Sequence, residues 1–178
     1  RTLAAHIAAA PRRALPANVA ERAKHHLLDT LSAMVSGSQL LPGRRAIEFA
    51  AAQGGKPEAC VIGSGILTTA INAALANGMH GHADETDDTY YLSLVHPGCS
   101  IVPAALAVAE RQRAGGTALL RAMVLGYDLC ARTSHALGVE RFRSSGRSTH
   151  SFGGTFGSAA AAAALLGLDR DQARYMLS

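Results

Sequence analysis

The chain has 178 residues, of which 48% are hydrophobic and 17% are charged, and its formal net charge is +4 at pH 7. This length fits one domain with its own core, and the composition excludes an intrinsically disordered chain. The basic residues are scattered and have no aromatic residues among them, so we expect no nucleic-acid partner. No apolar run reaches the roughly 20 residues of a membrane span, and the N-terminus lacks the order of a signal peptide. We therefore expect a cytoplasmic protein that makes no membrane contact.

The residue types favour helices. The chain is rich in alanine but contains only four Phe, four Tyr and no Trp, a composition that suits close-packed helices better than sheets. The cysteines Cys60, Cys99 and Cys130 are odd in number and form no CxxC pair, which indicates neither a disulfide framework nor a zinc ribbon. We predict a single all-α domain over residues 1–178.

Hydrophobic periodicity places the first elements along the chain. It predicts a helix over 18–38 and a shorter one over 42–52, and residues 58–65 then favour a lone strand or an extended link. A further helix is expected over 68–85. Residues 86–100 break the periodicity with Asp, Ser, Pro and Gly, which predicts a loop of the length at which loops are often functional.

The second half of the chain predicts three more helices and one loop before its last helix. Pro103 suits the first turn of a helix, and Thr117 is expected to cap the next one, which runs to about His135. Residues 138–150 predict a polar loop that contains arginines. The small residues of 151–167 predict a helix that packs tightly against a neighbour.

The last predicted helix begins at Asp169, a good N-cap residue. Its apolar residues Ala173, Met176 and Leu177 share one face, and we expect that face to lack a partner within this chain. The sequence therefore predicts a fragment of a longer protein, truncated at the C-terminus.

Ionisable side chains are densest between positions 80 and 96. A single residue of this kind is usually a solvated group, but few structural needs call for so many together, so we expect a functional site here. Outside this stretch, His25 and His26 lie on a predicted helix, where surface or packing roles are expected. The dense group comprises His80, His82, Asp84, Glu85, Asp87, Asp88, Thr89 and His96.

One interpretation of this group is a zinc site. His80, His82 and Asp84 approach the HxHxDH arrangement that binds zinc in metallo-hydrolases. Glu85 replaces the last histidine, and the preceding residues predict a helix rather than the strand that such a motif requires. A zinc hydrolase is therefore the weaker alternative, and we expect no metal.

A longer run of motifs resembles the MmgE/PrpD family, which includes 2-methylcitrate dehydratase. The motifs that carry the resemblance are LLDTLSAMVSGS, NAALANGMHGHADETDDT, HPGCSIVPAALAVAE and THSFGGTFGSAAAAAALLGLD, in the order and spacing of the family. They cover nearly the whole chain. The resemblance implies the helical N-terminal domain of such a protein, without its smaller α+β domain, and it also implies a homodimer.

The same resemblance implies an enzyme that acts on a small polycarboxylate. The family's activities are dehydration of 2-methylcitrate, decarboxylation of cis-aconitate and epimerisation of iminodisuccinate, none with a required metal or cofactor. We accordingly expect a 2-methylcitrate dehydratase-like lyase without a cofactor, with decarboxylase and epimerase as alternatives. A helical interaction module whose acidic loop binds a basic partner is the non-catalytic alternative.

The family motifs assign roles to particular residues. Asp88 and Thr89 match the end of the family pattern HAxDFDDT, His96 matches its HPS histidine, and His150 matches the histidine before the small-residue helix. Glu85 stands where the family has aspartate. Its extra methylene moves the carboxylate by about an ångström, which is enough to alter catalytic geometry, so the exact reaction stays open.

Proton removal next to a carboxylate needs a base poised near neutral pH, and histidine meets this need. We expect His96 and His150 to be the base and the acid, in an undecided order, with Glu85 or Asp88 orienting an imidazole. The remaining site residues would bind substrate carboxylates, for which hydroxyl, imidazole and guanidinium donors are suited. These are Thr89, His82, Arg143 and Arg147.

Overall fold

The structure is a computed structural model that describes residues 2–178. It is 72% helical, with one hairpin of two short strands, so the all-α prediction is confirmed. In chain order the elements are α1 (Thr2–Ala9), the 3-10 helix η1 (Ala10–Arg12), α2 (Ala17–Ser38), α3 (Leu41–Gln53), β1 (Ala59–Cys60), β2 (Leu67–Thr68), α4 (Ala70–His82), α5 (Pro97–Gln112), α6 (Gly116–Leu137), α7 (Val139–Ser144), α8 (Thr149–Leu166) and α9 (Arg170–Met176).

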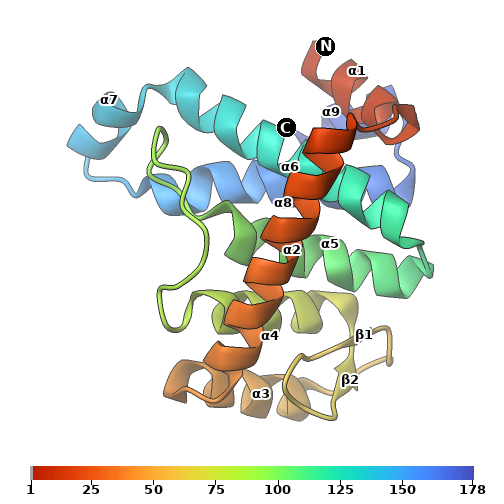
Figure 1. The fold of residues 1–178 in the computed structure, drawn as a ribbon, viewed down its shortest axis with the longest axis vertical. Coiled ribbons are helices and arrows are strands. Elements are labelled where there is room, and N and C mark those ends of the chain that lie inside the picture. Colours follow the sequence, from red (N-terminus) through yellow and green to blue (C-terminus); the bar gives the residue numbers. More distant parts are fainter. Residues whose placement is uncertain (1) are drawn as a thin grey trace.

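Helix α5 lies at the centre of the packing, between α4 on one side and α8 on the other. Helix α3 covers α4, α6 covers α8, and the long helix α2 crosses the face of this stack, as Figure 1 shows. The central core cluster lies where α2, α5, α6 and α8 meet, and its buried members include Met34, Ile101, Met123 and Ala161. The antiparallel pair β1–β2 lies beside α4 and α5.

Small residues let α6 and α8 approach each other closely. A Cβ atom added to Gly126 would lie 2.9 Å from the carbonyl oxygen of Gly157, and one added to Gly157 would lie 2.6 Å from that of Gly126. Neither distance is tolerated between real atoms. The prediction that the small-residue helix packs tightly is confirmed.

Several predicted boundaries in the second half are wrong. Helix α5 begins at Pro97 rather than near Pro103, which lies inside the helix and leaves the Cys99 carbonyl without its helical partner. Both prolines suit a first turn, and the sequence does not distinguish them. Helix α6 has Gly115 as its N-cap instead of Thr117, and most of the expected loop 138–150 is helical, in α7 and the start of α8.

Helix α9 begins as predicted but does have a partner. Asp169 accepts hydrogen bonds from the backbone of its first turn, and the side chain of Gln172 bonds back to the Asp169 N–H, which forms a capping box. The expectation of an unpartnered apolar face is wrong. Ala173 is fully buried in a cluster with Ile7 of α1 and Leu129 of α6, because the chain returns its two ends to one place.

A stripe of apolar residues on α4 is exposed. Ile71, Leu75 and Met79 follow one another at helical spacing and are 79%, 49% and 41% exposed. Such a stripe is compatible with an interface, and the expected homodimer stays a prediction. None of the helices in the described part of the chain is long and apolar enough to cross a membrane.

Candidate functional site

Three histidines of the predicted site meet where three helices begin or end. His82 is the last residue of α4, His96 is the N-cap of α5, and His150 lies in the first turn of α8. The loop between α4 and α5 runs past the start of α8, at the left of Figure 1. There the hydroxyl of Thr149 donates a hydrogen bond of 2.6 Å to the Leu94 carbonyl, which holds the loop against α8.

Asp87 lies at the centre of this group. Its side chain is fully buried, with Oδ1 3.1 Å from Nδ1 of His82 and Oδ2 3.6 Å from Nδ1 of His96. The centroids of the two imidazole rings are 5.2 Å apart. A carboxylate beside Nδ1 favours the tautomer that is protonated there, which leaves the lone pair on Nε2 to accept a proton.

His150 completes the group, with its ring centroid 5.0 Å from that of His96. Partial burial lowers the pKa of His150, and the neighbouring His96 and His82 lower it further, against the opposing effect of nearby carboxylates. Burial and nearby positive charge both disfavour a second imidazolium. The neutral, proton-accepting form of His150 is therefore favoured near neutral pH.

Glu85 and Thr89 lie beside the histidines, as expected. One carboxylate oxygen of Glu85 is 3.6 Å from Nε2 of His82, and its side chain is 75% exposed. The backbone of Glu85 has φ of +57°, a conformation that is uncommon outside glycine and that concentrates at functional sites. The hydroxyl oxygen of Thr89 is 3.4 Å from Nδ1 of His96.

Asp88 faces the other side of the loop. Its carboxylate accepts hydrogen bonds from the Gly98 backbone N–H, at 2.7 Å, and from the Tyr127 hydroxyl, at 2.8 Å. Nδ1 of His26 lies 2.9 Å from it. Asp88 therefore orients His26 rather than either predicted acid–base histidine, and it fixes the first turn of α5, which His96 caps.

Sequence patterns do not reveal the roles of two of these residues, Asp87 and His26. The sequence does not show which of Asp87 and Asp88 faces the histidines. Successive residues of an extended segment point to opposite sides, and the pattern does not assign either side. His26 has no acidic partner within its own helix, and its carboxylate comes from a distant loop. The available signal for Asp87 is the run Glu-Thr-Asp-Asp-Thr over residues 85–89, which precedes His96.

Removing the Asp88 carboxylate is expected to destabilise the fold. Asp88→Ala leaves the Gly98 N–H and the Tyr127 hydroxyl without their partner, which costs about 2–4 kcal/mol of unfolding free energy, measured by urea denaturation. Asp84→Ala is the control, since Asp84 also accepts two hydroxyl hydrogen bonds but nearer the surface, and it should cost below about 1 kcal/mol. Equal losses in both variants would contradict this role of Asp88.

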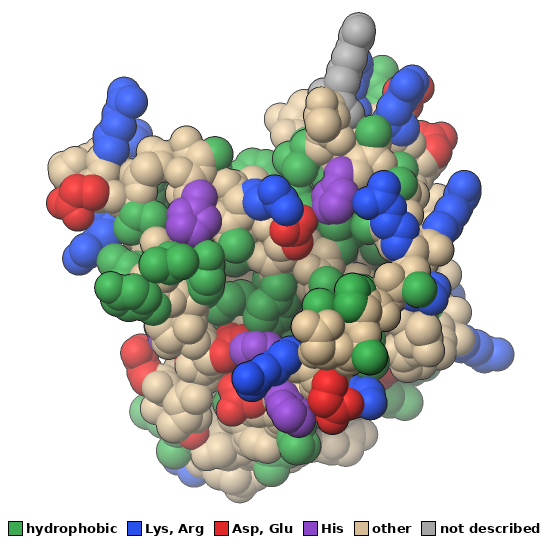
Figure 2. Space-filling view, turned by 45° about the horizontal axis from the view of Figure 1, so that its top comes forward, with side chains coloured by type: hydrophobic (Ala, Val, Ile, Leu, Met, Phe, Trp, Pro, Cys, Tyr) green, Lys and Arg blue, Asp and Glu red, His purple; other side chains and the backbone are tan. Residues whose placement is uncertain are grey.

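A cavity of about 240 Å³ borders the Asp88 network. Figure 2 shows histidine, acidic and basic side chains gathered beside a hollow with hydrophobic side chains at its floor. Thr89 belongs to the wall and also contacts His96, so the cavity and the histidine group meet at this residue. The lining residues are His26, Asp88, Thr89, Tyr90, Pro97, Tyr127 and Ala131.

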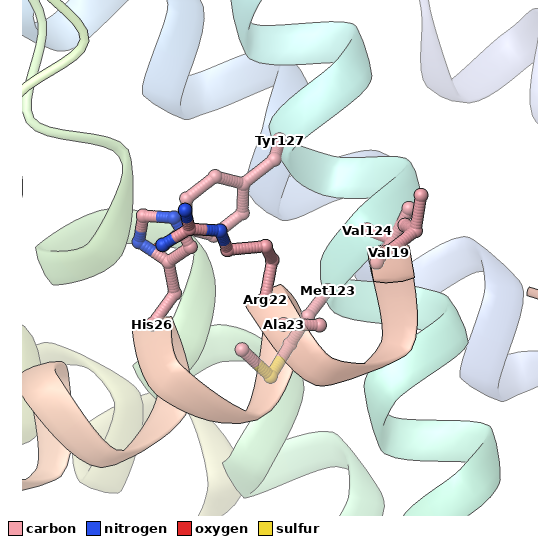
Figure 3. Close-up of a pocket in the computed structure, with 7 residues that line it drawn as sticks. All are labelled: Val19, Arg22, Ala23, His26, Met123, Val124 and Tyr127. Atoms are coloured by element: carbon pink, nitrogen blue, oxygen red, sulfur yellow. The ribbon is translucent and has the colours of Figure 1, made fainter. Parts of the chain in front are cut away.

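A second pocket, of about 160 Å³, adjoins this cavity and shares His26 and Tyr127 with it. Figure 3 shows the side chain of Arg22 extending toward the His26 ring, below the Tyr127 ring in this view, while Val19 and Val124 form the opposite end. Burial and the Asp88 charge raise the pKa of Tyr127, so its phenol stays a neutral donor.

The residues of the expected zinc motif do not converge. His80 is fully buried, with Nε2 3.2 Å from the Gly43 carbonyl oxygen, and burial lowers its pKa. Asp84 instead accepts a hydrogen bond from Ser36. The zinc-hydrolase alternative built on His80, His82 and Asp84 is therefore wrong, because residues two apart at a helix end point in different directions.

A different group has the spacing of metal ligands. Within residues 2–178, the imidazoles of His82 and His96 and the carboxylate of Asp87 place one ligand atom each within 4.8 Å of one another. The nearby thiol of Cys99 is not part of this group. Burial and the adjacent Asp87 raise the pKa of Cys99 to about 12, so it stays a neutral thiol and a poor nucleophile.

The two predicted arginines lie on exposed chain that precedes the His150 end of α8. Arg143 is in α7, and Arg147 precedes α8, with its guanidinium 3.4 Å from the Ser145 hydroxyl. Neither forms an ion pair within the described residues 2–178. Their role in carboxylate binding stays a prediction.

Comparison with known proteins identifies the family. The sequence profile of the MmgE/PrpD N-terminal domain matches residues 1–178. The chain belongs to the MmgE/PrpD family. Over 169 residues this MmgE/PrpD domain is 36% identical to the cis-aconitate decarboxylase-like protein oryM of Aspergillus oryzae (strain ATCC 42149 / RIB 40), a match that covers 88% of the chain. The same match covers 34% of the relative, so the chain spans about a third of that protein's length.

Membership confirms the family resemblance of the motifs and places the domain in a group of lyases and related enzymes. His82 and His96, from opposite ends of the motif stretch, meet on Asp87, and His150 reaches them from α8.

Proposed function

We propose that this domain supplies the acid–base histidines of a lyase for small polycarboxylates, which moves a proton at the carbon next to a carboxylate. The observation that carries this proposal is the contact of the His150 and His96 rings, 5.0 Å between centroids, with His96 beside a fully buried Asp87. Two adjacent imidazoles suit a reaction in which one proton is removed and another is delivered.

His150 is the base in this proposal. Its lowered pKa favours the neutral imidazole, and the residue is exposed, so a substrate can reach it. His96 is its partner, because Asp87 and Thr89 both lie at Nδ1 and direct Nε2 away from themselves. The shared carboxylate fixes the ring orientation, as an orienting carboxylate does in other proton-transfer sites.

The substrate carboxylates would be bound by donors around this pair. Thr89 lies between the histidine group and the cavity, so its hydroxyl can reach a carboxylate that enters the cavity. His82 offers an imidazole on the other side of Asp87. Arg143 and Arg147 supply planar guanidinium groups, which pair with carboxylates in a bidentate manner.

Three reactions of this class use the same two histidines. In dehydration of a 2-methylcitrate-like acid, the base takes the proton next to the carboxylate, the acid protonates the leaving hydroxyl, and water departs. In decarboxylation of a cis-aconitate-like acid, carbon dioxide departs and the carbanion that remains takes a proton from the acid. In epimerisation, the proton returns on the opposite face. We propose dehydration first, and the name of the Aspergillus relative supports decarboxylation as the second candidate.

Proton NMR in deuterated water tests the proposal. The full-length protein is incubated with 2-methylcitrate, citrate, cis-aconitate and iminodisuccinate, and we expect deuterium incorporation next to a carboxylate, or product, with at least one of them. Consumption of the unsaturated acid with loss of carbon dioxide indicates decarboxylation, and elimination of water indicates dehydration. Deuterium exchange without either indicates epimerisation. Folded protein that gives no change with any of these acids contradicts the proposal and favours the helical interaction module.

A further inference from the structure

We propose that His82, Asp87 and His96 form a binding site for one divalent cation of the zinc class, and that a bound ion blocks proton transfer by His96. This site differs from the HxHxDH-like motif, with which it shares only His82. Its ligands come from the end of α4, the following loop and the start of α5.

The spacing of the three ligand atoms fits a tetrahedral ion. Zinc binds imidazole nitrogen and carboxylate oxygen at about 2.0–2.2 Å, which places two ligand atoms of one tetrahedral ion roughly 3.4 Å apart. From Oδ2 of Asp87 the distances to Nδ1 are 3.3 Å for His82 and 3.6 Å for His96. One nitrogen of each imidazole and one Asp87 oxygen lie within 4.8 Å of one another, and the His82 side chain is 39% exposed.

The charge of Asp87 supports a cation at this point. Its side chain is completely buried, and within residues 2–178 its ion-pair contacts are with histidines, not with lysine or arginine. A buried carboxylate requires compensating positive charge or hydrogen bonds. A divalent ion supplies that charge and prefers nitrogen and oxygen ligands of this kind. Glu85 lies 3.6 Å from Nε2 of His82, the ring nitrogen opposite the proposed ligand atom, where its carboxylate can accept that nitrogen's proton and hold the ring in place.

A bound ion would act through the histidine tautomer. Metal on Nδ1 of His96 occupies that nitrogen's lone pair, so the neutral ring keeps its single proton on Nε2 and cannot become the imidazolium that delivers a proton as the acid. The metal-free ring has the opposite arrangement, because Asp87 and Thr89 lie at Nδ1. The effect on turnover rests on the proposed function, whereas the binding of the ion does not.

Metal titration of the full-length protein tests the site directly. Co²⁺ is followed by its visible absorption, which reports low-coordinate nitrogen and oxygen ligands, and Zn²⁺ is counted by equilibrium dialysis. We expect one Co²⁺ ion to bind per chain, and added Zn²⁺ to displace it. Asp87→Asn and His82→Gln should each weaken binding by more than about 100-fold, since changes outside the ligand shell alone cost 10–100-fold. Two variants at different ligands guard against one that does not fold.

His25→Gln is the matched control, because His25 is an exposed histidine 3.6 Å from the carboxylate of Glu21. Its Zn²⁺ affinity should equal that of the unmodified protein. Absence of stoichiometric Zn²⁺, or equal binding by Asp87→Asn and His82→Gln, overturns the site. Full turnover at full Zn²⁺ occupancy overturns the inhibitory effect. If Zn²⁺ binding depends on His82 and Asp87 but the protein turns over no polycarboxylate, the metal site stands and the proposed function is refuted.

Discussion

Replacing His150 or His96 with glutamine is expected to lower turnover of the polycarboxylate substrate by about 10²–10⁴-fold, the usual contribution of one acid–base group. Glutamine keeps hydrogen-bonding capacity and approximate size but cannot take up a proton at neutral pH. His150 is exposed, the His96 side chain is 16% exposed and neither belongs to a core cluster, so the unfolding temperature should stay close to that of the unmodified protein.

The pH profile distinguishes a lost base from a distorted site. His150 must be neutral to accept a proton, and its pKa is lowered, so activity of the unmodified protein should fall only as the pH drops below the ordinary histidine value of 6.5. That acidic limb should vanish in His150→Gln. The exposed substitution His25→Gln should leave rate and profile unchanged. A His150→Gln protein with a rate within threefold of normal would refute the assignment.

Replacing Gly37 with alanine is expected to destabilise the fold by about 1–3 kcal/mol, in spite of alanine's better helix propensity. A Cβ atom at Gly37 would collide with the carbonyl oxygen of His80 and lie 3.1 Å from Cβ of Ala83. Because the collision is with helix backbone, α2 and α4 have to move apart. His82 is two residues from the contact, so activity should also fall.

Gly116→Ala is the matched control for Gly37→Ala. Gly116 is the first residue of α6, and a Cβ atom there meets nothing within 4 Å. Its urea midpoint should be unchanged or slightly higher, since alanine loses less backbone freedom on folding. Gly37→Ala that is as stable as this control would show that α2 and α4 do not pack as closely as the structure has them.

The helices could largely be predicted from the sequence, because helix formation depends on local properties. Apolar spacing placed α2 and α4 to within a few residues, and Asp169 marked the start of α9. Errors arose where two local signals were equivalent. Pro97 and Pro103 both suit a first turn, and only the packing of α5 between α4 and α8 decides that the helix begins at the earlier one.

The candidate site was predictable as a set of residues but not as an arrangement. The motifs identified Glu85, Thr89, His96 and His150, and all four lie around one point in the structure. Their grouping on Asp87 depends on contacts between the end of α4, the start of α5 and the start of α8. The contacts with α8 join positions more than fifty residues apart, and no local pattern encodes them.

The sequence by itself determined the helical class, the family and the set of residues proposed for proton chemistry, because these follow from composition, periodicity and motif order. Only the tertiary structure decided that Asp87 serves the histidines while the adjacent Asp88 serves α5 and His26. Two neighbouring carboxylates are chemically identical in a sequence. They acquire different roles because the loop that carries them passes between two groups of helices, and each side of the loop meets different partners.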